Sequence, residues 1–363
     1  MSTYQSNVTS AFVDLATYDA LEAYLYGGDD AVTYFVRQHR KSTWFSQVPV
    51  VLSNASGTAD FGNQWSVTIS RAGDYLLNTW LETNTPTITH FADYNLFWAK
   101  NFMHNLVEEC TITFNDLIAA RFDSTQLDFW SAFTVPASKK SGYRTMTGYG
   151  VETLSANGRD SVFLRGVSAE ESHKFNLPLP FFYSRESGVA LPTAALPYND
   201  MRINFRFRPL SSLLYVYEPA AQSAATSATN THYTGTAALT GTRVWANYAV
   251  VSNDERKLMG TATRDIAIEQ MQAAPITSYT TTGNSTYDLR FSHGVKALMF
   301  ALRAKYGPIT GAINAASPHK LDGMGGDSLL SRYDTRYQEN TGTTTTFNRK
   351  SPIDNVTLLY ENT

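Results

Sequence analysis

The sequence predicts an all-β protein built from sandwiches of antiparallel sheets, and three observations support this fold class. The 363 residues include 21 Tyr and 20 Phe beside abundant Thr, and aromatic and β-branched side chains pack well on pleated surfaces. Several runs alternate apolar and polar residues with a period of two, which is typical of strands with one face in water. Few helical patterns separate these runs, which favours a sandwich over a parallel sheet. A chain of this length folds as two domains or one large one.

A short helix is the first predicted element, within an N-terminal segment that spans residues 1–30. Thr17 is a candidate N-cap, Asp19 and Glu22 lie in the first turns, and Gly27 with its neighbouring glycine ends the pattern. The apolar stripe of this helix consists of Tyr18, Leu21 and Leu25. The residues before it read as a polar arm with nothing to bury. A helix this short is marginal alone, so we expect it to dock on its own domain or on a neighbouring subunit.

Two runs alternate more clearly than the rest. In residues 103–114 the even-numbered positions from Leu106 to Phe114 are apolar except Glu108, which places that end of the strand near solvent. In residues 200–208 the odd-numbered positions from Met201 to Phe207 are apolar, and the even-numbered ones are Arg or Asn. Further strands are predicted at 31–38, 64–69, 74–83, 244–251, 264–271, 286–291 and 295–303.

Short helical insertions interrupt the strands. Residues 124–133 and 136–146 form two of them, and a third begins at Asn253 and ends near Gly260. The first insertion has an apolar face made of Leu127, Trp130 and Phe133. The proline-punctuated tract 177–200 reads as an edge strand that turns a corner into the next strand.

Composition divides the chain into two halves. The segment 209–243 contains too few large apolar residues to form a core, and 304–354 is a second loop-like tract. We therefore predict a first sandwich at 31–215, a linker at 216–243 and a second sandwich at 244–363.

Charge and cysteine content limit the function classes. The net charge is −3 and the pI near 6.2, which disfavours a protein that coats nucleic acid. The single cysteine, Cys110, cannot form an intramolecular disulfide or a thiolate cluster and indicates a reducing compartment. The sequence shows neither a secretory signal nor a membrane-spanning run, so cytosolic location is expected and the sequons at Asn7, Asn54, Asn284 and Asn355 are expected to be unused.

We predict no catalytic residue, no cofactor-binding residue, no metal ligand and no cofactor. The sequence lacks a G-x-S-x-G elbow, and GMGGDS at 323–328 lacks the lysine of a phosphate-binding loop. The histidines are dispersed, at His39, His90, His104, His173, His232, His293 and His319. On a strand, His104 and Glu108 would share a face but lie too far apart for one metal ion, so we interpret His104 as a hydrogen-bonded structural residue.

An arginine stripe is the most prominent charge feature. Arg202, Arg206 and Arg208 alternate with Phe205 and Phe207, which face the opposite way. A surface for single-stranded nucleic acid would place aromatic and basic side chains on the same face. The stripe therefore reads as the polar face of a half-buried strand or as an inter-domain contact.

The chain resembles the major capsid proteins of iridoviruses, within the wider family from large icosahedral double-stranded DNA viruses. The resemblance includes SRAGDYLLNTWL at 70–81 and VWANYAVVSNDERKLMG at 244–260. The other matching stretches, in chain order, are 6–28, 101–148, 176–207, 264–275, 287–303 and 357–363.

This resemblance implies a double jelly roll, which is two consecutive eight-stranded β-sandwiches with short helical insertions. It further implies a structural subunit that forms a homotrimeric capsomer of nearly hexagonal outline, assembled in the host cytoplasm. The implied partners are further copies of the chain, minor and penton capsid proteins and the internal viral membrane, with no sequence-specific nucleic acid. Family members continue past the position of Thr363, so we expect an incomplete second barrel with exposed pairing edges and a tendency to aggregate.

Two other functions compete with the capsid interpretation. A carbohydrate-binding or glycosidase jelly roll would need a groove with exposed Trp or Tyr, and for hydrolysis two carboxylates roughly 5–10 Å apart. A nucleic-acid packaging protein is disfavoured by the net charge.

Overall fold

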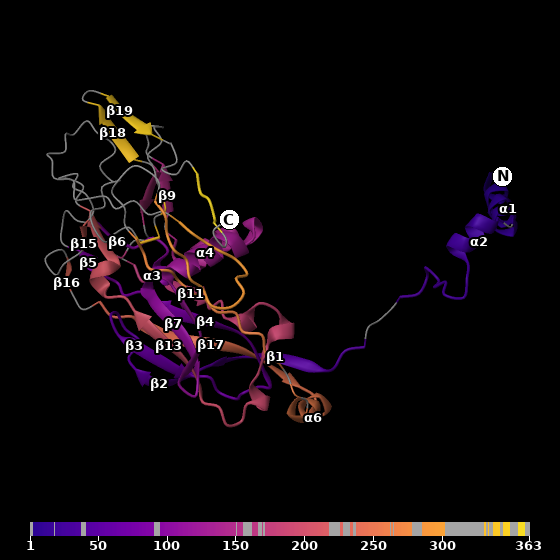
Figure 1. Cartoon of the computed structure of the whole chain (residues 1–363), viewed down its shortest axis with the longest axis horizontal. Helices are drawn as coiled ribbons and strands as arrows, with labels where there is room; N and C mark the ends of the chain where they lie inside the picture. The colour runs from indigo at the N-terminus through magenta and orange to yellow at the C-terminus, as the bar shows by residue number, and fades with distance from the viewer. Residues whose placement is uncertain are drawn as a thin grey trace. The chain divides into compact units, whose positions relative to one another are not determined.

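The computed structural model describes most of residues 3–301 and several short stretches after them. The gaps are residues 18, 38–40, 91–94, 150, 155–161, 166–168, 170, 218–225, 228–232, 235–236, 262, 264 and 278–284. After residue 301 the described residues are 330, 331, 333, 337–341, 344–348 and 355–359. The chain divides into two compact units, Met1–Thr43 and Trp44–Thr363 (Figure 1).

The first unit contains two helices, α1 (Thr3–Ala16) and α2 (Ala20–Tyr26). Helix α2 confirms the predicted short helix, although its cap differs from the prediction. Asp19 Oδ1 accepts a hydrogen bond from the Leu21 N–H at 2.9 Å, so Asp19 caps α2. The Thr17 hydroxyl instead donates back to the last turn of α1.

Two predictions for the N-terminal residues were wrong. The polar arm is helical, because Val8, Ala11, Phe12 and Leu15 recur at i, i+3, i+4 and i+7 among its Ser, Thr and Asn residues. The strand predicted at 31–38 is absent from 31–37, the part of it that is described. Those residues are exposed and have no strand beside them, and an unpaired strand leaves its backbone groups without a ladder.

The first sheet of the second unit is antiparallel. Its strands, in spatial order, are β1 (Phe45–Val51), β17 (Thr240–Val251), β4 (Tyr75–Asn84) and β11 (Lys174–Pro178), with β12 (Leu191–Pro192) also paired to β4. Residues 244–251 therefore belong to the first sandwich, and the prediction that the second sandwich begins at 244 was wrong for them. Their alternation identifies a strand but does not say which sheet it joins.

The second sheet faces the first. Its order is β2 (Ser53–Gly57), β3 (Gln64–Thr68), β13 (Met201–Phe207), β7 (Val107–Phe114) and β8 (Leu117–Asp123), all antiparallel. Strand β13 lies between β3 and β7 and pairs with both, which confirms the predicted strand at 200–208. Strand β7 confirms the run 103–114 only from Val107, because the residues before it are helical.

One hydrophobic cluster fills the space between the two sheets. Strand β13 contributes four side chains that are at most 2% exposed, namely Met201, Ile203, Phe205 and Phe207. The opposite sheet contributes Leu76, Leu81, Val244 and Tyr248 with no exposed surface. This burial supplies the main stabilisation of the sandwich, at ~1.5–3 kcal/mol for each large apolar side chain.

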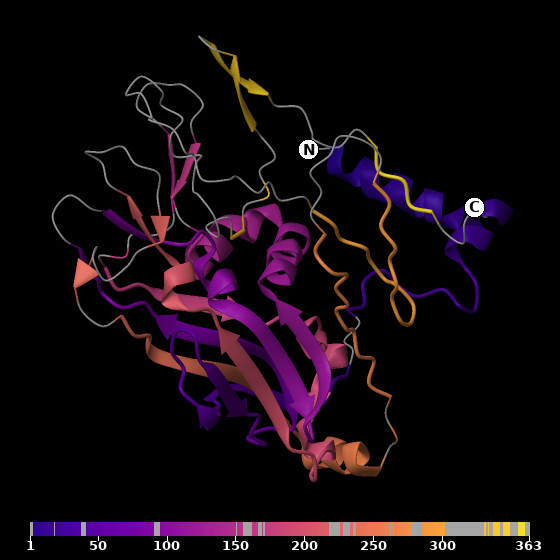
Figure 2. The ribbon, with the colours of Figure 1, turned by 60° about the vertical axis from the view of Figure 1, so that its left-hand side comes forward.

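Helices lie at both ends of the strands (Figures 1 and 2). At one end are α3 (Phe102–Leu106), α4 (Ser124–Thr134) and α5 (Ala137–Thr147), and at the other end is α6 (Asn253–Thr261). Helices α4, α5 and α6 confirm the three predicted insertions. The predicted apolar face of α4 is buried only in part. Leu127 is buried, together with Ser124 and Asp128, whereas Phe133 is 73% exposed.

Glycine ends α5 for a steric reason. Gly148 has φ +71°, and its N–H bonds back to the last turn of the helix. A Cβ at this position would lie 3.0 Å from the Phe175 ring, so both the backbone conformation and the space require glycine.

The remaining elements are short. The strands are β5 (Thr89–His90), β6 (Asn95–Trp98), β9 (Val151–Leu154), β10 (Val162–Arg165), β14 (Leu214–Tyr217), β15 (Thr226–Ser227), β16 (Tyr233–Thr234), β18 (Tyr337–Thr341) and β19 (Thr344–Asn348). Single 3₁₀ turns cover Phe182–Ser184, Ser187–Val189, Thr193–Ala195 and Leu210–Ser212. The tract 177–200 supplies β12 on the outer side of β4 and then crosses to β13 in the other sheet, as predicted.

The strands predicted in the second half are not formed in the described residues. Residues 265–271, 286–291 and 295–301 carry no strand, so these predictions were wrong for the described part of each run. Their apolar side chains alternate, but no described strand pairs with them, and alternation makes a strand only where a ladder partner is present.

Candidate interaction surfaces

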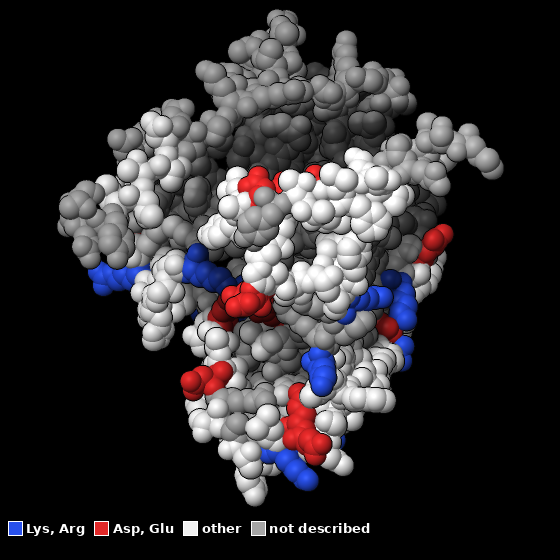
Figure 3. All heavy atoms as spheres, turned by 90° about the vertical axis from the view of Figure 1, so that its right-hand side faces the viewer, with Lys and Arg blue, Asp and Glu red and all other residues white. Residues whose placement is uncertain are grey.

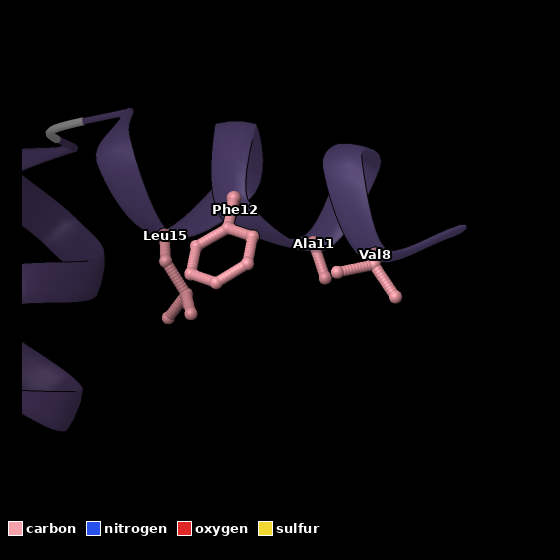
Figure 4. Close-up of a pocket in the computed structure, with 4 residues that line it drawn as sticks. All are labelled: Val8, Ala11, Phe12 and Leu15. Atoms are coloured by element: carbon pink, nitrogen blue, oxygen red, sulfur yellow. The ribbon is translucent and has the colours of Figure 1, made fainter. Parts of the chain in front are cut away.

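Helix α1 presents one apolar face to solvent. Val8, Ala11, Phe12 and Leu15 lie on the same side of the helix and line an open depression of about 320 Å³ (Figure 4). Phe12 is 68% exposed and Leu15 is 85% exposed. A helix of this length is marginal in water without a partner for its apolar face, so this face is a candidate contact surface.

The residues that follow continue the exposed apolar character and add negative charge. Leu21, Tyr24 and Leu25 of α2 are all more than 60% exposed, and Tyr34 and Phe35 are each 91% exposed. The first 36 residues contain no Lys, Arg or His, and their acidic residues are Asp14, Asp19, Glu22, Asp29 and Asp30. This N-terminal surface therefore combines apolar contact area with a net negative charge.

A second exposed apolar region lies in residues 265–301. Its large exposed side chains are Ile266, Ile268, Ile276, Tyr287, Leu289, Val295, Leu298, Met299 and Phe300. Gln270 donates to the Ala119 carbonyl oxygen of edge strand β8 at 2.8 Å, and Glu269 pairs with Arg185. Exposed apolar side chains that gather into one patch mark interaction sites, so this segment is a candidate contact surface.

Two arginines of the stripe, Arg202 and Arg206, pair with carboxylates, and Arg208 donates to the Ser124 hydroxyl oxygen at 2.9 Å. Arg206 contacts Glu108 at 3.0 Å and Glu109 at 3.3 Å, both on β7. Arg202 contacts Asp200 at 2.5 Å. The interpretation of the stripe as the polar face of a half-buried strand is confirmed. On the face drawn in Figure 3, the described Lys and Arg side chains are interspersed with Asp and Glu.

His104 lies in a buried polar network rather than on a strand. It belongs to α3 and is 1% exposed. Its Nδ1 lies 2.7 Å from Asp128 Oδ1 and its Nε2 lies 2.8 Å from the Tyr143 hydroxyl. The interpretation of His104 as a hydrogen-bonded structural residue is confirmed. Its predicted place on the same strand face as Glu108 was wrong, because His104 lies in α3 and the chain enters β7 only at Val107.

This network has the connectivity of an acid, a base and a hydroxyl, but its electrostatics oppose nucleophilic chemistry. Burial, and then the nearby charge of Asp128, raise the pKa of the Tyr143 hydroxyl. A nucleophile needs a lowered pKa or easy loss of its proton. The sequence analysis missed Asp128, although its position at i+4 from the buried Ser124 and beside Leu127 could have indicated an inward-facing carboxylate.

Other candidate groups are buried, dispersed or outside the described residues. Burial raises the pKa of the Cys110 thiol well above its ordinary value, which makes it unreactive. Among the described residues no group of three His, Cys, Asp or Glu side chains could hold a metal ion, and no helix is long and apolar enough to span a membrane. The glycine-rich run 323–328 and Asn284 lie outside the described residues.

Comparison with family models matches the chain to viral capsid proteins along almost its whole length. Residues 33–251 match the model described as major capsid protein N-terminus, and residues 255–363 match the model described as large eukaryotic DNA virus major capsid protein. The junction between the two models falls directly after β17, where the first sandwich ends.

Curated relatives and solved structures agree with these matches. The chain is 50% identical to the major capsid protein of Simulium iridescent virus over 375 residues, covering 100% of this chain and 75% of that protein. It is 36% identical to the major capsid protein of Frog virus 3, covering 99% of this chain and 75% of the relative. The Faustovirus major capsid protein structure aligns with a TM-score of 0.50 at 12% identity, over 66% of this chain and 61% of that one, which supports the fold alone. Such structural neighbours are double jelly-roll capsid proteins, so the predicted all-β fold class is confirmed.

Proposed function

The chain belongs to the family of major capsid proteins of large eukaryotic DNA viruses, and on that premise we propose that it assembles as a homotrimeric capsomer of nearly hexagonal outline. Its role is structural, as a subunit of the virion capsid. The observation that carries the trimer proposal is the exposed apolar surface of α1 and α2 and of residues 265–301, since obligate interfaces bury large apolar areas. Each chain would contribute two similar sandwiches to the trimer, and the six sandwiches would form the six corners of a nearly hexagonal outline.

We propose the following domain organisation. Residues 1–30 are an N-terminal arm. The first jelly roll comprises residues 31–215 together with β17, which is its last strand. The second jelly roll takes up the residues after β17. This assignment follows the pairing of β17 with β1 and β4 and the junction of the two family models after residue 251.

The partners of the N-terminal arm are proposed to be capsid proteins. Membrane-surface helices that bind anionic lipid are rich in Lys and Arg, whereas the arm carries only acidic charge. Its apolar face therefore fits a protein surface with basic residues better than it fits the internal membrane. Further copies of the chain, the minor capsid proteins and the penton proteins are the proposed partners, and contact with the membrane would involve other residues.

We further propose that the protein is not an enzyme and that it assembles in the host cytoplasm. The buried polar groups described above are structural, with raised rather than lowered pKa values for Tyr143 and Cys110. The unpaired Cys110 suits a reducing compartment.

Light scattering on the purified protein tests the assembly state. We expect a mass of three chains, because a closed trimer withdraws the exposed apolar side chains from water. A species that stays monomeric as the protein concentration rises would contradict the trimer.

Replacement of Phe12 and Leu15 by serine tests the contact role of α1. If both side chains are buried in the assembly, their loss removes ~1.5–3 kcal/mol each and weakens association about a hundredfold or more. Sedimentation measures this change, and thermal unfolding of the dissociated subunit should be unaffected because both residues are exposed within the chain. Ser10→Ala, on the same helix but outside the apolar face, is the matched control. Equal association of the double variant and the control would remove α1 from the interface.

A further inference from the structure

The helical end of the first sandwich contains a buried amide that is partnered by a residue from far along the chain. Asn105 is 1% exposed. Its Nδ2 donates to the Lys100 carbonyl oxygen at 2.6 Å and to the Ser331 hydroxyl oxygen at 2.8 Å. An amide nitrogen carries two hydrogens, so these two short contacts satisfy both of them. Without Ser331, one hydrogen of the buried Asn105 amide would lose its 2.8 Å hydrogen bond.

A buried carboxylate beside this amide is completed by the same distant segment. Asp128 is 8% exposed. Its Oδ1 accepts hydrogen bonds from Asn101 Nδ2 at 3.1 Å and pairs with His104 Nδ1. Its Oδ2 accepts the Tyr333 hydroxyl proton at 3.1 Å. A buried charge is costly unless it is paired and hydrogen-bonded, and Tyr333 adds a donor to Asp128 Oδ2 from outside α3 and α4.

Apolar packing adds to the polar contacts. The rings of Phe129 and Tyr333 stack with centroids 5.7 Å apart, and Leu330 packs against the hydrophobic cluster. Ser331 is 7% exposed and has φ +56°, a backbone conformation that residues other than glycine seldom adopt. The hydrogen bond from Asn105 and the surrounding packing hold it in that conformation.

We propose that Leu330, Ser331 and Tyr333, which we call the strap, fasten the second half of each subunit to the first. Leu330 packs on the hydrophobic cluster, and Ser331 and Tyr333 contact Asn105, Asp128 and Phe129. At the opposite end of the sandwich, Arg256 of α6 pairs with Asp74 through its Nε and Nη2, each at 2.9 Å. The second half is thus held at both ends of the first sandwich. The docking of the strap does not depend on the proposed function. Its expected consequence, a rigid subunit for capsomer assembly, rests on that function.

Hydrogen–deuterium exchange on the whole chain tests the strap. Tyr333→Phe removes the hydroxyl that donates a hydrogen bond to Asp128, so the amides of Leu330, Ser331 and Tyr333 should exchange about ten- to a hundredfold faster in local opening. Tyr198→Phe is the matched control, because Tyr198 is 95% exposed, and it should leave exchange unchanged. Amides of these three residues that already exchange without protection in the parent protein, or whose exchange Tyr333→Phe leaves unaltered, would overturn the proposal.

Thiol cross-linking asks whether the strap docks within its own chain. In a Phe129→Cys, Tyr333→Cys double variant, a short bifunctional thiol reagent should join the two positions within one polypeptide, and the buried Cys110 should not compete. Cross-links only between chains would contradict docking within the subunit. Because both readouts are made on the chain whatever its oligomeric state, failure of the strap is distinguishable from failure of the trimer.

Discussion

Replacement of Phe205 by alanine should lower the free energy of unfolding by ~3–5 kcal/mol, the range for truncating a buried aromatic residue in a core. Phe205 is 2% exposed on the central strand β13. Its ring stacks on Trp65 at 5.5 Å and on Phe207 at 5.8 Å between centroids. Two aromatic neighbours that stack on the missing ring cannot both close the cavity, which keeps the cost high. Denaturant unfolding followed by tryptophan fluorescence measures it.

The matched control for this truncation is Phe133→Ala. Phe133 is 73% exposed on α4, so its removal should change stability by less than ~0.5 kcal/mol. If both variants lost the same stability, the assignment of β13 as the centre of the core would be wrong.

The first sandwich was largely predictable because its strands carry the pattern themselves. The run from Met201 to Phe207 alternates without an exception, and its odd positions are the buried ones. On β7, Cys110 and Ile112 are two residues apart and are likewise both buried. Such strands have one face against the core and one in water, and a period of two records that arrangement directly. The helical insertions predicted at 124–133, 136–146 and from Asn253 to Gly260 correspond to α4, α5 and α6.

Pairing in space was not predictable, and most errors arise from it. The alternation in 244–251 marks a strand, but nothing in those residues says that it lies between β1 and β4. The apolar positions in 265–301 alternate in the same way without a partner among the described strands. His104 and Asp128 lie 24 residues apart, and their contact depends on how α3 packs against α4. Local residue order encodes periodicity, whereas contacts between distant segments depend on the whole fold.

Replacement of Asp74 by alanine should lower the free energy of unfolding by ~3 kcal/mol at neutral pH. Asp74 is 5% exposed. Its carboxylate accepts hydrogen bonds from Arg256 and from the Val251 N–H, each at 2.9 Å. The variant would leave that buried N–H without its carboxylate acceptor and Arg256 without its ion pair, so the junction between β17 and α6 should loosen. Urea unfolding at pH 7 measures the loss, and Asp288→Ala is the control for removing a carboxylate, because Asp288 is exposed and lies outside the helices and strands.

The same residue gives the stability a defined pH dependence. The hydrogen bond from Arg256 lowers the pKa of the Asp74 carboxyl below its ordinary value despite burial. A carboxyl with a lowered pKa in the folded state stabilises the protein above its unfolded pKa of ~3.9, and this contribution is lost as the pH falls through the folded pKa. The stability difference between the parent protein and Asp74→Ala should therefore be constant from pH 5 to 7 and shrink below about pH 4. Glu82 behaves similarly, because its bonds from Arg243 and Lys174 outweigh burial and lower its pKa, but it is common to both proteins and cancels in the difference. A difference that stays constant down to pH 2 would show that Asp74 acts through packing rather than through its charge.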